Sequence, residues 1–335
     1  MTLGINCITS NNYENGGLVM GHNMKSTTKT RSKTIVQKDK VKKWSVAYLY
    51  LIPFVIGLLV FRLYPFVQAF LISFEQRRIG RPTQWVGLDN YIELFTGTTH
   101  GTLFRQSLGI TFRYVFLTVP LVLVFALFIA FILNFKLKGI GFFRTAFYIP
   151  SILGGSVSVA ILWRFTFGNQ GLINSVLGIF GIPVVGWLTD PNLILVMLAL
   201  LRAWQFGSVM LIFLSALQNV PTSFYEAARM DGAGKWRQFF TITIPIITPV
   251  ILFNVIQLLV AAFQEFNAPF LITQESNMFG PGNSAMLLNI FIYQRSFIMS
   301  QFGIGSAASW IMFVIIMIFT LVIFKSSNKW VFYND

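Results

Sequence analysis

The chain has 335 residues, of which 55% are hydrophobic and 16% aromatic, while only 11% are charged. Soluble domains carry about 25% charged residues, so this composition excludes an ordinary soluble protein and predicts a membrane protein. A formal net charge of +14 would favour nucleic-acid binding in a soluble protein. In a membrane protein it is typical of Lys and Arg gathered in cytoplasmic loops, so we expect no nucleic-acid partner.

The chain begins with a polar region and continues with apolar stretches. Residues 1–24 are polar, aperiodic and without the apolar core of a secretory signal, and together with the basic stretch that follows they predict a disordered basic cytoplasmic tail at 1–44. A helix needs about 20 mainly apolar residues to cross the hydrocarbon. Stretches that meet this requirement lie near 45–74, 105–133, 142–166, 191–217, 245–267 and 303–324.

These stretches predict an all-α fold, a polytopic membrane helix bundle of about six transmembrane helices. We place the transmembrane domain at 45–325 and a cytoplasmic C-terminal tail at 326–335. The first stretch is longer than a crossing requires and contains Pro53 and Pro65, so we expect it to kink or to extend beyond the bilayer.

The distribution of the 25 Lys and Arg residues predicts the orientation. If the N-terminal tail is cytoplasmic, most of them share its side, among them those at 25–43, 136–144, 229–237 and 325–329. The opposite side carries Arg77, Arg78, Arg81 and Arg295. Since cytoplasmic loops are enriched in Lys and Arg, we expect both termini in the cytoplasm.

A charged, glycine-containing segment, "EAARMDGAGKW" at 226–236, interrupts the apolar pattern on the predicted cytoplasmic side. It is not a phosphate-binding loop, because its lysine is followed by tryptophan rather than by the Ser or Thr that would meet magnesium. Ser223 precedes Glu226 by three positions, which predicts a capping box at a helix start, and Gly232 suits the C-terminal cap. A second helical stretch follows, so we expect an exposed helix–turn–helix that offers a helix to a partner's groove.

This segment resembles the EAA loop of the integral-membrane subunits of binding-protein-dependent ABC importers. The family pattern is E-A-A, three residues, Gly, nine residues and I-x-L-P. Its positions are occupied here by Glu226, Ala227, Ala228, Gly232, Ile242, Ile244 and Pro245, with Ile in place of Leu at 244. The resemblance implies that the loop at 218–245 is a cytoplasmic coupling helix that docks on an ATPase. The implied coupling residues are Glu226, Ala227, Ala228, Asp231 and Gly232.

The resemblance extends over the chain from about Trp44 and narrows to the carbohydrate importers, close to the larger permease subunit of maltose-type systems. "NYIELF" at 90–95, the segment 138–167 and the C-terminal "WVFY" carry this looser similarity. It implies half of an oligosaccharide pathway in a bacterial cytoplasmic (inner) membrane, surrounded by lipid. The implied partners are a second permease subunit, two cytoplasmic ATPase subunits that carry ATP and magnesium, and an extracytoplasmic solute-binding protein. This chain itself is expected to be no enzyme and to bind no metal or cofactor directly.

Polar residues inside spans usually face the bundle interior or a water-filled path, so they are the candidate substrate contacts. At about 100° per residue, four of those in the span 245–267 share an arc of about 100°. They are Asn254, Gln257, Gln264 and Glu265, while Asn267 lies off the arc. Amides and a carboxylate suit sugar hydroxyls, but the same stripe can join the helix to neighbouring subunits, and both interpretations remain open. Trp204, Gln205 and Tyr293 are further candidates.

Three arginines, Arg62, Arg113 and Arg202, fall inside predicted spans, where Glu265 is the only acid. Because a charge at the bilayer centre costs at least about 2.5 kcal/mol, these arginines need an explanation. Pairing with acids of a second permease, bonds to helix carbonyls and snorkelling are the ordinary explanations. The alternative is that an arginine faces the path and favours an acidic, uronate-type saccharide, with Arg202 as the best candidate.

Two other function classes are weighed against the importer permease. A self-sufficient ion-coupled secondary transporter would need acids in mid-membrane, and Glu265 lies near the outer end of its span. A membrane-embedded enzyme would need a catalytic constellation, yet the only histidines are His22 and His100. Neither class accounts for the loop at 218–245.

Overall fold

A computed structural model describes residues 48–80, 82–135, 139–273 and 279–332, and the predicted tail at 1–44 lies outside them. By its internal contacts the chain divides at Pro65 into one unit of residues 1–65 and another of residues 66–335. In the first unit the described residues belong to a helix that starts at Tyr48 and continues to Ile72. The second unit holds the remaining elements, and the arrangement described below is internal to it.

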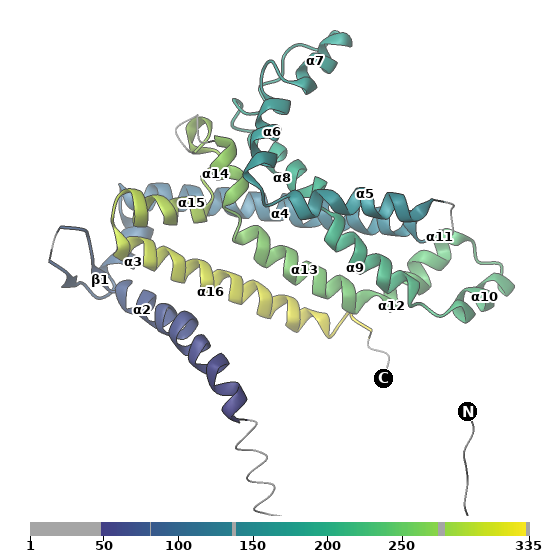
Figure 1. Cartoon of the computed structure of the whole chain (residues 1–335), viewed down its shortest axis with the longest axis horizontal. Coiled ribbons are helices and arrows are strands. Elements are labelled where there is room, and N and C mark those ends of the chain that lie inside the picture. Colours follow the sequence, from purple (N-terminus) through teal and green to yellow (C-terminus); the bar gives the residue numbers. More distant parts are fainter. Residues whose placement is uncertain (1–47, 81, 136–138, 274–278, 333–335) are drawn as a thin grey trace, which may run out of the picture. The chain divides into compact units, whose positions relative to one another are not determined.

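The regular secondary structure of the described residues is almost entirely helical (Figure 1). The elements from the first helix to α7 are η1 (Leu59–Leu63), α2 (Tyr64–Ile72), β1 (Glu75–Gln76), β2 (Gln84–Trp85), α3 (Asp89–Thr96), α4 (His100–Leu133), α5 (Ile140–Leu153), α6 (Val157–Phe167) and α7 (Leu172–Ile179). Those from α8 to α13 are α8 (Ile194–Trp204), α9 (Gly207–Gln218), α10 (Thr222–Met230), α11 (Lys235–Gln238), η2 (Phe239–Thr243), α12 (Ile244–Ile246) and α13 (Thr248–Phe263). The last are α14 (Asn267–Thr273), η3 (Pro281–Asn283), α15 (Leu288–Tyr293), η4 (Gln294–Ile298) and α16 (Phe302–Ser327), and β1 and β2 form one antiparallel hairpin.

Among the described residues, four helical segments are long and apolar enough to cross a membrane: Tyr48–Ile72, His100–Leu133, Thr248–Thr273 (α13 and α14 together) and Phe302–Ser327. Two bent pairs meet the same test together: Ile140–Leu153 with Val157–Ile179, bent by 102°, and Ile194–Trp204 with Gly207–Gln218, bent by 49°. Counting each pair as one span gives up to six. The prediction of an all-α polytopic membrane bundle is confirmed.

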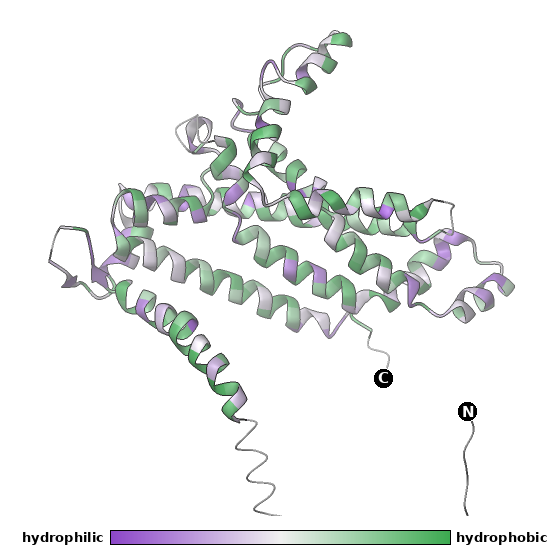
Figure 2. Ribbon diagram, viewed as in Figure 1, coloured by the Kyte–Doolittle hydropathy of each residue, from purple (hydrophilic) through white to green (hydrophobic). Residues whose placement is uncertain are grey.

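The long helices are apolar on faces that the chain itself does not cover (Figure 2). In α16, burial is concentrated in the first turns, while Met317, Leu321 and Phe324 are exposed. Exposed apolar surface on this scale is stable against lipid chains or a neighbouring membrane subunit rather than against water.

Helix α4 is the centre of the second unit and packs against α3, α8, α9, α13 and α15. Small side chains allow the closest approach: Ala126 and Ala130 are fully buried in the main core, together with Met197 and Phe213. Close helix contact through small residues is typical of membrane bundles, because lipid chains provide no hydrophobic force between helices. The start of α4 contacts α3, and its end contacts the α11–η2 segment through Phe131.

Two of the three π-helical segments end two residues before a proline, at Pro65 and Pro245. Proline has no N–H to donate and its ring displaces the carbonyl of the preceding turn, so a local change of hydrogen-bond register absorbs the misfit. Near Pro65, the expected irregularity is therefore a π-helical segment. At Pro53 the chain is α-helical.

Candidate functional site

Three interrupted helix pairs meet at one small polar cavity, which we call the helix-break cavity. The interruptions fall between α5 and α6, between α8 and α9, and between α13 and α14. The cavity has a volume of about 130 Å³, and residues at or next to every interruption line it. The lining residues are Tyr114, Gly154, Gly155, Leu198, Leu201, Arg202, Gln205, Glu265, Asn267 and Ala268. Interrupted helices at membrane depth are found where backbone lines a cavity, because lipid cannot satisfy free backbone groups.

Local sequence explains two of the interruptions. The "GG" at 154–155 ends α5, and Ser156 then starts α6, since its hydroxyl accepts a hydrogen bond from Val159 N at 3.3 Å. Glycine is a weak helix former and serine is a preferred N-cap, so the chain turns here. At the α13–α14 interruption, Glu265 Oε1 accepts a hydrogen bond from Ala268 N at 3.4 Å, which satisfies a donor in the first turn of α14.

A short chain of hydrogen bonds holds the cavity's cationic side chain. Arg202 Nη1 donates to Gln205 Oε1 at 3.1 Å, and Gln205 Nε2 donates to Gly154 O at 3.1 Å. Gln205 packs closely on the glycine, where an added Cβ would lie 2.4 Å from Gln205 Cδ. Arg202 is thus held by a neutral amide, which leaves other guanidinium donors free for a ligand.

The predicted pathway residues Arg202, Glu265, Asn254, Trp204, Gln257 and Gln264 do not lie at one site. Arg202 and Glu265 line the helix-break cavity together. Asn254 is 1% exposed and donates to Val250 O of its own helix at 3.0 Å. Trp204 packs against the Trp163 ring at 5.7 Å, and neither it nor the exposed Gln257 and Gln264 lines the cavity.

The helical projection of the span 245–267 is wrong beyond Phe263, where α13 ends. Glu265 belongs to the interruption and Asn267 to α14, so the cavity brings together Glu265 and Asn267, which the projection separated. Sequence reasoning also missed Tyr114, Gly154 and Gly155 as cavity residues. The Gly-Gly pair in an apolar stretch was the signal that could have found this break.

The predicted helix–turn–helix is present, although its start differs from the prediction. Helix α10 has Pro221 at its N-cap and no side-chain cap, so the capping box at Ser223 is wrong. Its end is as predicted: Gly232 has φ +74°, its N–H donates to Arg229 O at 3.0 Å, and Ala233 N donates to Ala228 O at 2.9 Å. These two bonds form a Schellman motif, for which glycine is preferred because no Cβ strains the left-handed backbone.

Every residue of α10 retains solvent exposure. Glu226, Ala227, Asp231 and Gly232 are exposed and Ala228 is half-buried, so the predicted coupling residues are presented outward. Exposed apolar side chains accompany them at Phe224, Met230, Trp236 and Phe240, with Met230 89% exposed. An exposed apolar patch rimmed by polar residues is typical of a protein-binding surface.

Contacts from the rest of the bundle hold this loop. The hydroxyls of Tyr225 and Thr243 are 2.8 Å apart, which ties α10 to the segment that leads into α13. The ring centroids of Phe131, at the end of α4, and Phe239 are 4.5 Å apart. The loop is therefore fixed to two membrane helices.

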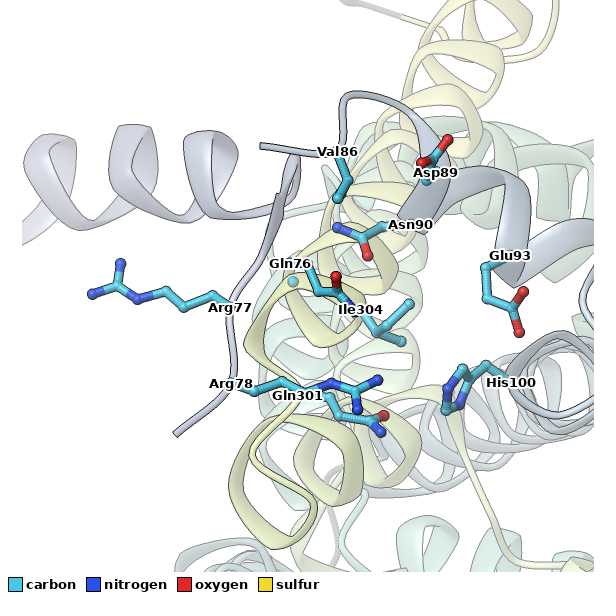
Figure 3. Close-up of a pocket in the computed structure, with 11 residues that line it drawn as sticks. Gln76, Arg77, Arg78, Val86, Asp89, Asn90, Glu93, His100, Gln301 and Ile304 are labelled. Atoms are coloured by element: carbon cyan, nitrogen blue, oxygen red, sulfur yellow. The ribbon is translucent and has the colours of Figure 1, made fainter. Parts of the chain in front are cut away.

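A third feature is a polar pocket of about 310 Å³ formed by the β1–β2 hairpin, α3 and the first turns of α4 and α16 (Figure 3). Its charged side chains are of both signs: Arg77, Arg78, Asp89 and Glu93. In Figure 3, Arg77 extends away from the other labelled side chains. Because the charge is mixed, this pocket has no clear preference for the sign of a ligand.

Asn90 and Gly303 hold the walls of this mixed-charge pocket together. Asn90 Nδ2 donates to Ser73 O at 2.8 Å and to Glu75 O at 3.0 Å, which fixes α3 to the strand. A Cβ at Gly303 would lie 2.0 Å from Glu75 O, so only glycine lets α16 pass so close. The predicted similarity segment at 90–95 thus has a structural role at this end of the bundle.

The fold and these sites define a polytopic membrane protein with an interrupted-helix cavity and an exposed helical loop. The chain belongs to the family described as "Binding-protein-dependent transport system inner membrane component", whose sequence profile matches residues 95–332. It is 43% identical over 316 residues to the "Probable ABC transporter permease protein YesP" of Bacillus subtilis (strain 168), covering 94% of this chain and 98% of the relative. It is 32% identical to the "Arabinooligosaccharides transport system permease protein AraP" of the same organism, covering 86% and 90% of the two chains.

A solved structure has the same fold. It is a chain of a bacterial ABC transporter involved in the import of the acidic polysaccharide alginate, with a TM-score of 0.76 and 22% sequence identity, covering 88% of this chain and 98% of that chain. The chain is therefore a permease subunit of the ABC-importer type, and the predicted family is confirmed.

Proposed function

We propose that this chain forms half of the translocation pathway of an ATP-driven oligosaccharide importer and binds the saccharide in the helix-break cavity. The observation that carries the proposal is the convergence of three helix interruptions on one cavity that contains Arg202, Gln205, Glu265 and Asn267. Side chains of these types offer directed donors and acceptors to hydroxyl groups. The similarity to an arabinooligosaccharide permease supports a saccharide as substrate class.

The partners follow from the same proposal. A solute-binding protein, which the family description names, delivers the saccharide, and a second permease completes the pathway. Two ATPase subunits carry ATP and magnesium, and the loop at 218–245 docks on one of them through Glu226, Ala227, Ala228, Asp231 and Gly232. Family membership leaves the ion-coupled secondary transporter without support.

We further propose that the substrate is acidic, of the uronate type. Arg202 lies within α8 and borders the cavity, where its guanidinium is bonded to an amide and not to a carboxylate. A guanidinium pairs with a carboxylate through two parallel donors, which is a stronger contact than it makes with a neutral hydroxyl. Glu265 on the same cavity disfavours a second anionic group close to its own carboxylate.

The test is uptake by the complete transporter in proteoliposomes, with acidic and neutral oligosaccharides of equal length. We expect wild type to prefer the acidic one, Arg202→Gln to lose about tenfold in acidic uptake alone, and Arg202→Lys to fall between them. Preference of the wild type for the neutral saccharide, or equal loss of both in Arg202→Gln, would contradict an acidic substrate.

The proposed orientation places both termini and the loop at 218–245 in the cytoplasm. In a background without Cys7, a cysteine at Asn283 should react with an impermeant reagent in intact cells, and one at Lys235 only after permeabilisation. Asn90 is less suitable as an outer probe, because its side chain is 6% exposed and holds the hairpin. The reverse labelling pattern would overturn the orientation and the coupling role of the loop.

A further inference from the structure

A third cavity, of about 380 Å³, lies where the first half of α4 faces the start of α8 and the η3 turn. We call it the arginine pocket, because Arg105 and Arg113 line it and no Asp or Glu does. This composition differs from that of the helix-break cavity, which contains Glu265, and from that of the mixed-charge pocket. The arginine pocket is the one of these three that is lined by positive charge alone.

Helix geometry places the two arginines on either side of a recess. Arg105, Gly109 and Arg113 are four residues apart in α4 and so form one stripe on its surface. The two arginines are separated by about 12 Å along the helix axis. A Cβ at Gly109 would meet no atom within 4 Å, so the glycine leaves open space between them.

The two guanidinium groups differ in their partners. Arg105 donates to Phe95 O and, at 3.4 Å, to Thr102 Oγ1, which holds it on the helix surface. In the described part of the chain, neither a hydrogen bond nor an ion pair engages Arg113, whose side chain is exposed. Arg113 is therefore the arginine with a free donor set.

A buried hydroxyl in the same wall also lacks a partner. Ser284 is 9% exposed, and its Oγ has no hydrogen-bond partner among the residues that the structure describes. Buried polar groups are nearly always satisfied by protein, water or ligand, so an unpaired one in a pocket wall points to a polar occupant. Gln106 Nε2 donates to Gly282 O at 3.0 Å and so fixes α4 to the loop that carries this serine.

The position of Arg113 suits an entry site. Residues 114–133 of α4 contain no charge and span about 30 Å, enough for a bilayer crossing. Arg113 thus stands next to this uncharged segment, within the candidate span His100–Leu133. The two cavities adjoin: their lining residues Arg113 and Tyr114 are consecutive on α4, and on α8 Leu195 borders the arginine pocket while Arg202, about 10 Å further along the helix, borders the helix-break cavity.

We propose that the arginine pocket is a second anion site, which binds a carboxylate of an acidic saccharide at the mouth of the pathway, above the helix-break cavity. Arg113 provides the main contact, with Ser284 and Arg105 as further donors. The inference rests on the proposed function for the class of substrate. Two neighbouring anion sites favour a saccharide with carboxylates on more than one ring over a monosaccharide.

The experiment measures occupancy of the pocket directly. Asn192 lines it and is exposed, so Asn192→Cys in a background without Cys7 provides a thiol for labelling in the complete reconstituted transporter. The probe ligands are a uronic-acid trisaccharide and a neutral trisaccharide, each delivered by its loaded binding protein. We expect the acidic probe to slow labelling about tenfold and the neutral probe to leave it nearly unchanged.

Arg113→Gln should abolish this protection, Arg113→Lys should retain part of it, and Gly109→Leu should abolish it by filling the recess while both arginines remain. Gly141→Leu, at an α5 glycine that also has open space around it, is the matched control for a leucine on a helix surface. Absence of protection in the parent, equal protection by the neutral probe, or protection that survives Arg113→Gln would each overturn the proposal.

The same variants distinguish a failure of the proposed function from a failure of the arginine-pocket proposal. Arg202→Gln is expected to lower acidic uptake while protection at Asn192→Cys persists, because Arg202 lines only the helix-break cavity and Asn192 only the arginine pocket. If Arg202→Gln transports normally and Arg113→Gln still abolishes protection, the assignment of the helix-break cavity is wrong and the arginine pocket stands. If Arg202→Gln loses uptake while Arg113→Gln keeps protection, the reverse holds.

Discussion

The exposed loop around α10 and the helix-break cavity are built in opposite ways. The loop is local: its glycine cap, its helix and its outward side chains fall within about 20 consecutive residues. The cavity draws on α4, the α5–α6 break, α8 and the α13–α14 break, which are far apart in the chain. An exposed helical loop can thus be encoded in one segment, whereas a polar cavity depends on how several irregular helices meet.

The largest effect that would test this comparison is expected at Gly232. Gly232→Pro fixes φ near −65° where the loop needs +74°, and it removes the N–H that bonds to Arg229 O. The local cost is about 3 kcal/mol or more, and we expect both uptake and stimulated ATPase activity to fall at least tenfold. Gly232→Asn is the control, since asparagine tolerates the left-handed region and should keep most activity. Normal ATPase stimulation in Gly232→Pro would show that the loop geometry is not needed for coupling.

A smaller effect is expected in the cavity, from a pair of adjacent glycines. Gly154→Ala places a Cβ 2.4 Å from Gln205 Cδ, so Gln205 must move and release Arg202. At Gly155 a Cβ meets nothing within 4 Å, which makes Gly155→Ala the matched control. We expect Gly154→Ala to lower acidic uptake about five- to tenfold, with ATPase stimulation retained, and Gly155→Ala to change it less than twofold. Equal behaviour of the two variants would contradict the hydrogen-bonded positioning of Arg202.

The polar stripe predicted on α13 gives a third test, with a smaller expected effect. Asn254 is buried and donates to Val250 O, so Asn254→Ala should destabilise the extracted transporter by about 1 kcal/mol. Selectivity between acidic and neutral saccharides should stay the same, because Asn254 does not line the cavity. Thermal unfolding and competitive uptake measure the two quantities. A change in selectivity would place Asn254 in the pathway after all.

The smallest effect is expected at the tether of the loop. Tyr225→Phe removes the hydroxyl that lies 2.8 Å from Thr243 Oγ1, at a cost of about 1 kcal/mol or less. We expect ATPase stimulation to fall about twofold with selectivity unchanged, as measured in proteoliposomes. Thr243→Val should have the same effect, and the double variant should be no worse than either single one. Additive losses would show that the two hydroxyls act independently.

The sequence by itself determined the class of fold, the apolar segments and the exposed loop. Hydrophobicity decides which segments cross a membrane, and glycine at a left-handed position decides where α10 ends, so both are properties of consecutive residues. The family resemblance carried by Glu226 to Pro245 was confirmed by the family match over residues 95–332. Even here a local rule failed, because Pro221 and not Ser223 stands at the N-cap.

The cavity was decided only by the tertiary structure. Helical projection assumes one continuous helix, but α13 ends at Phe263, and this brings Glu265 and Asn267 to the same cavity as Arg202. In the same way, Arg105 precedes Gly282 by 177 residues and Arg113 precedes it by 169. Both arginines share a pocket with Gly282 because Gln106 Nε2 donates a hydrogen bond to its carbonyl. The physical reason is that lipid satisfies no backbone group, so an interrupted membrane helix persists only where other parts of the chain complete its hydrogen bonds and line the space.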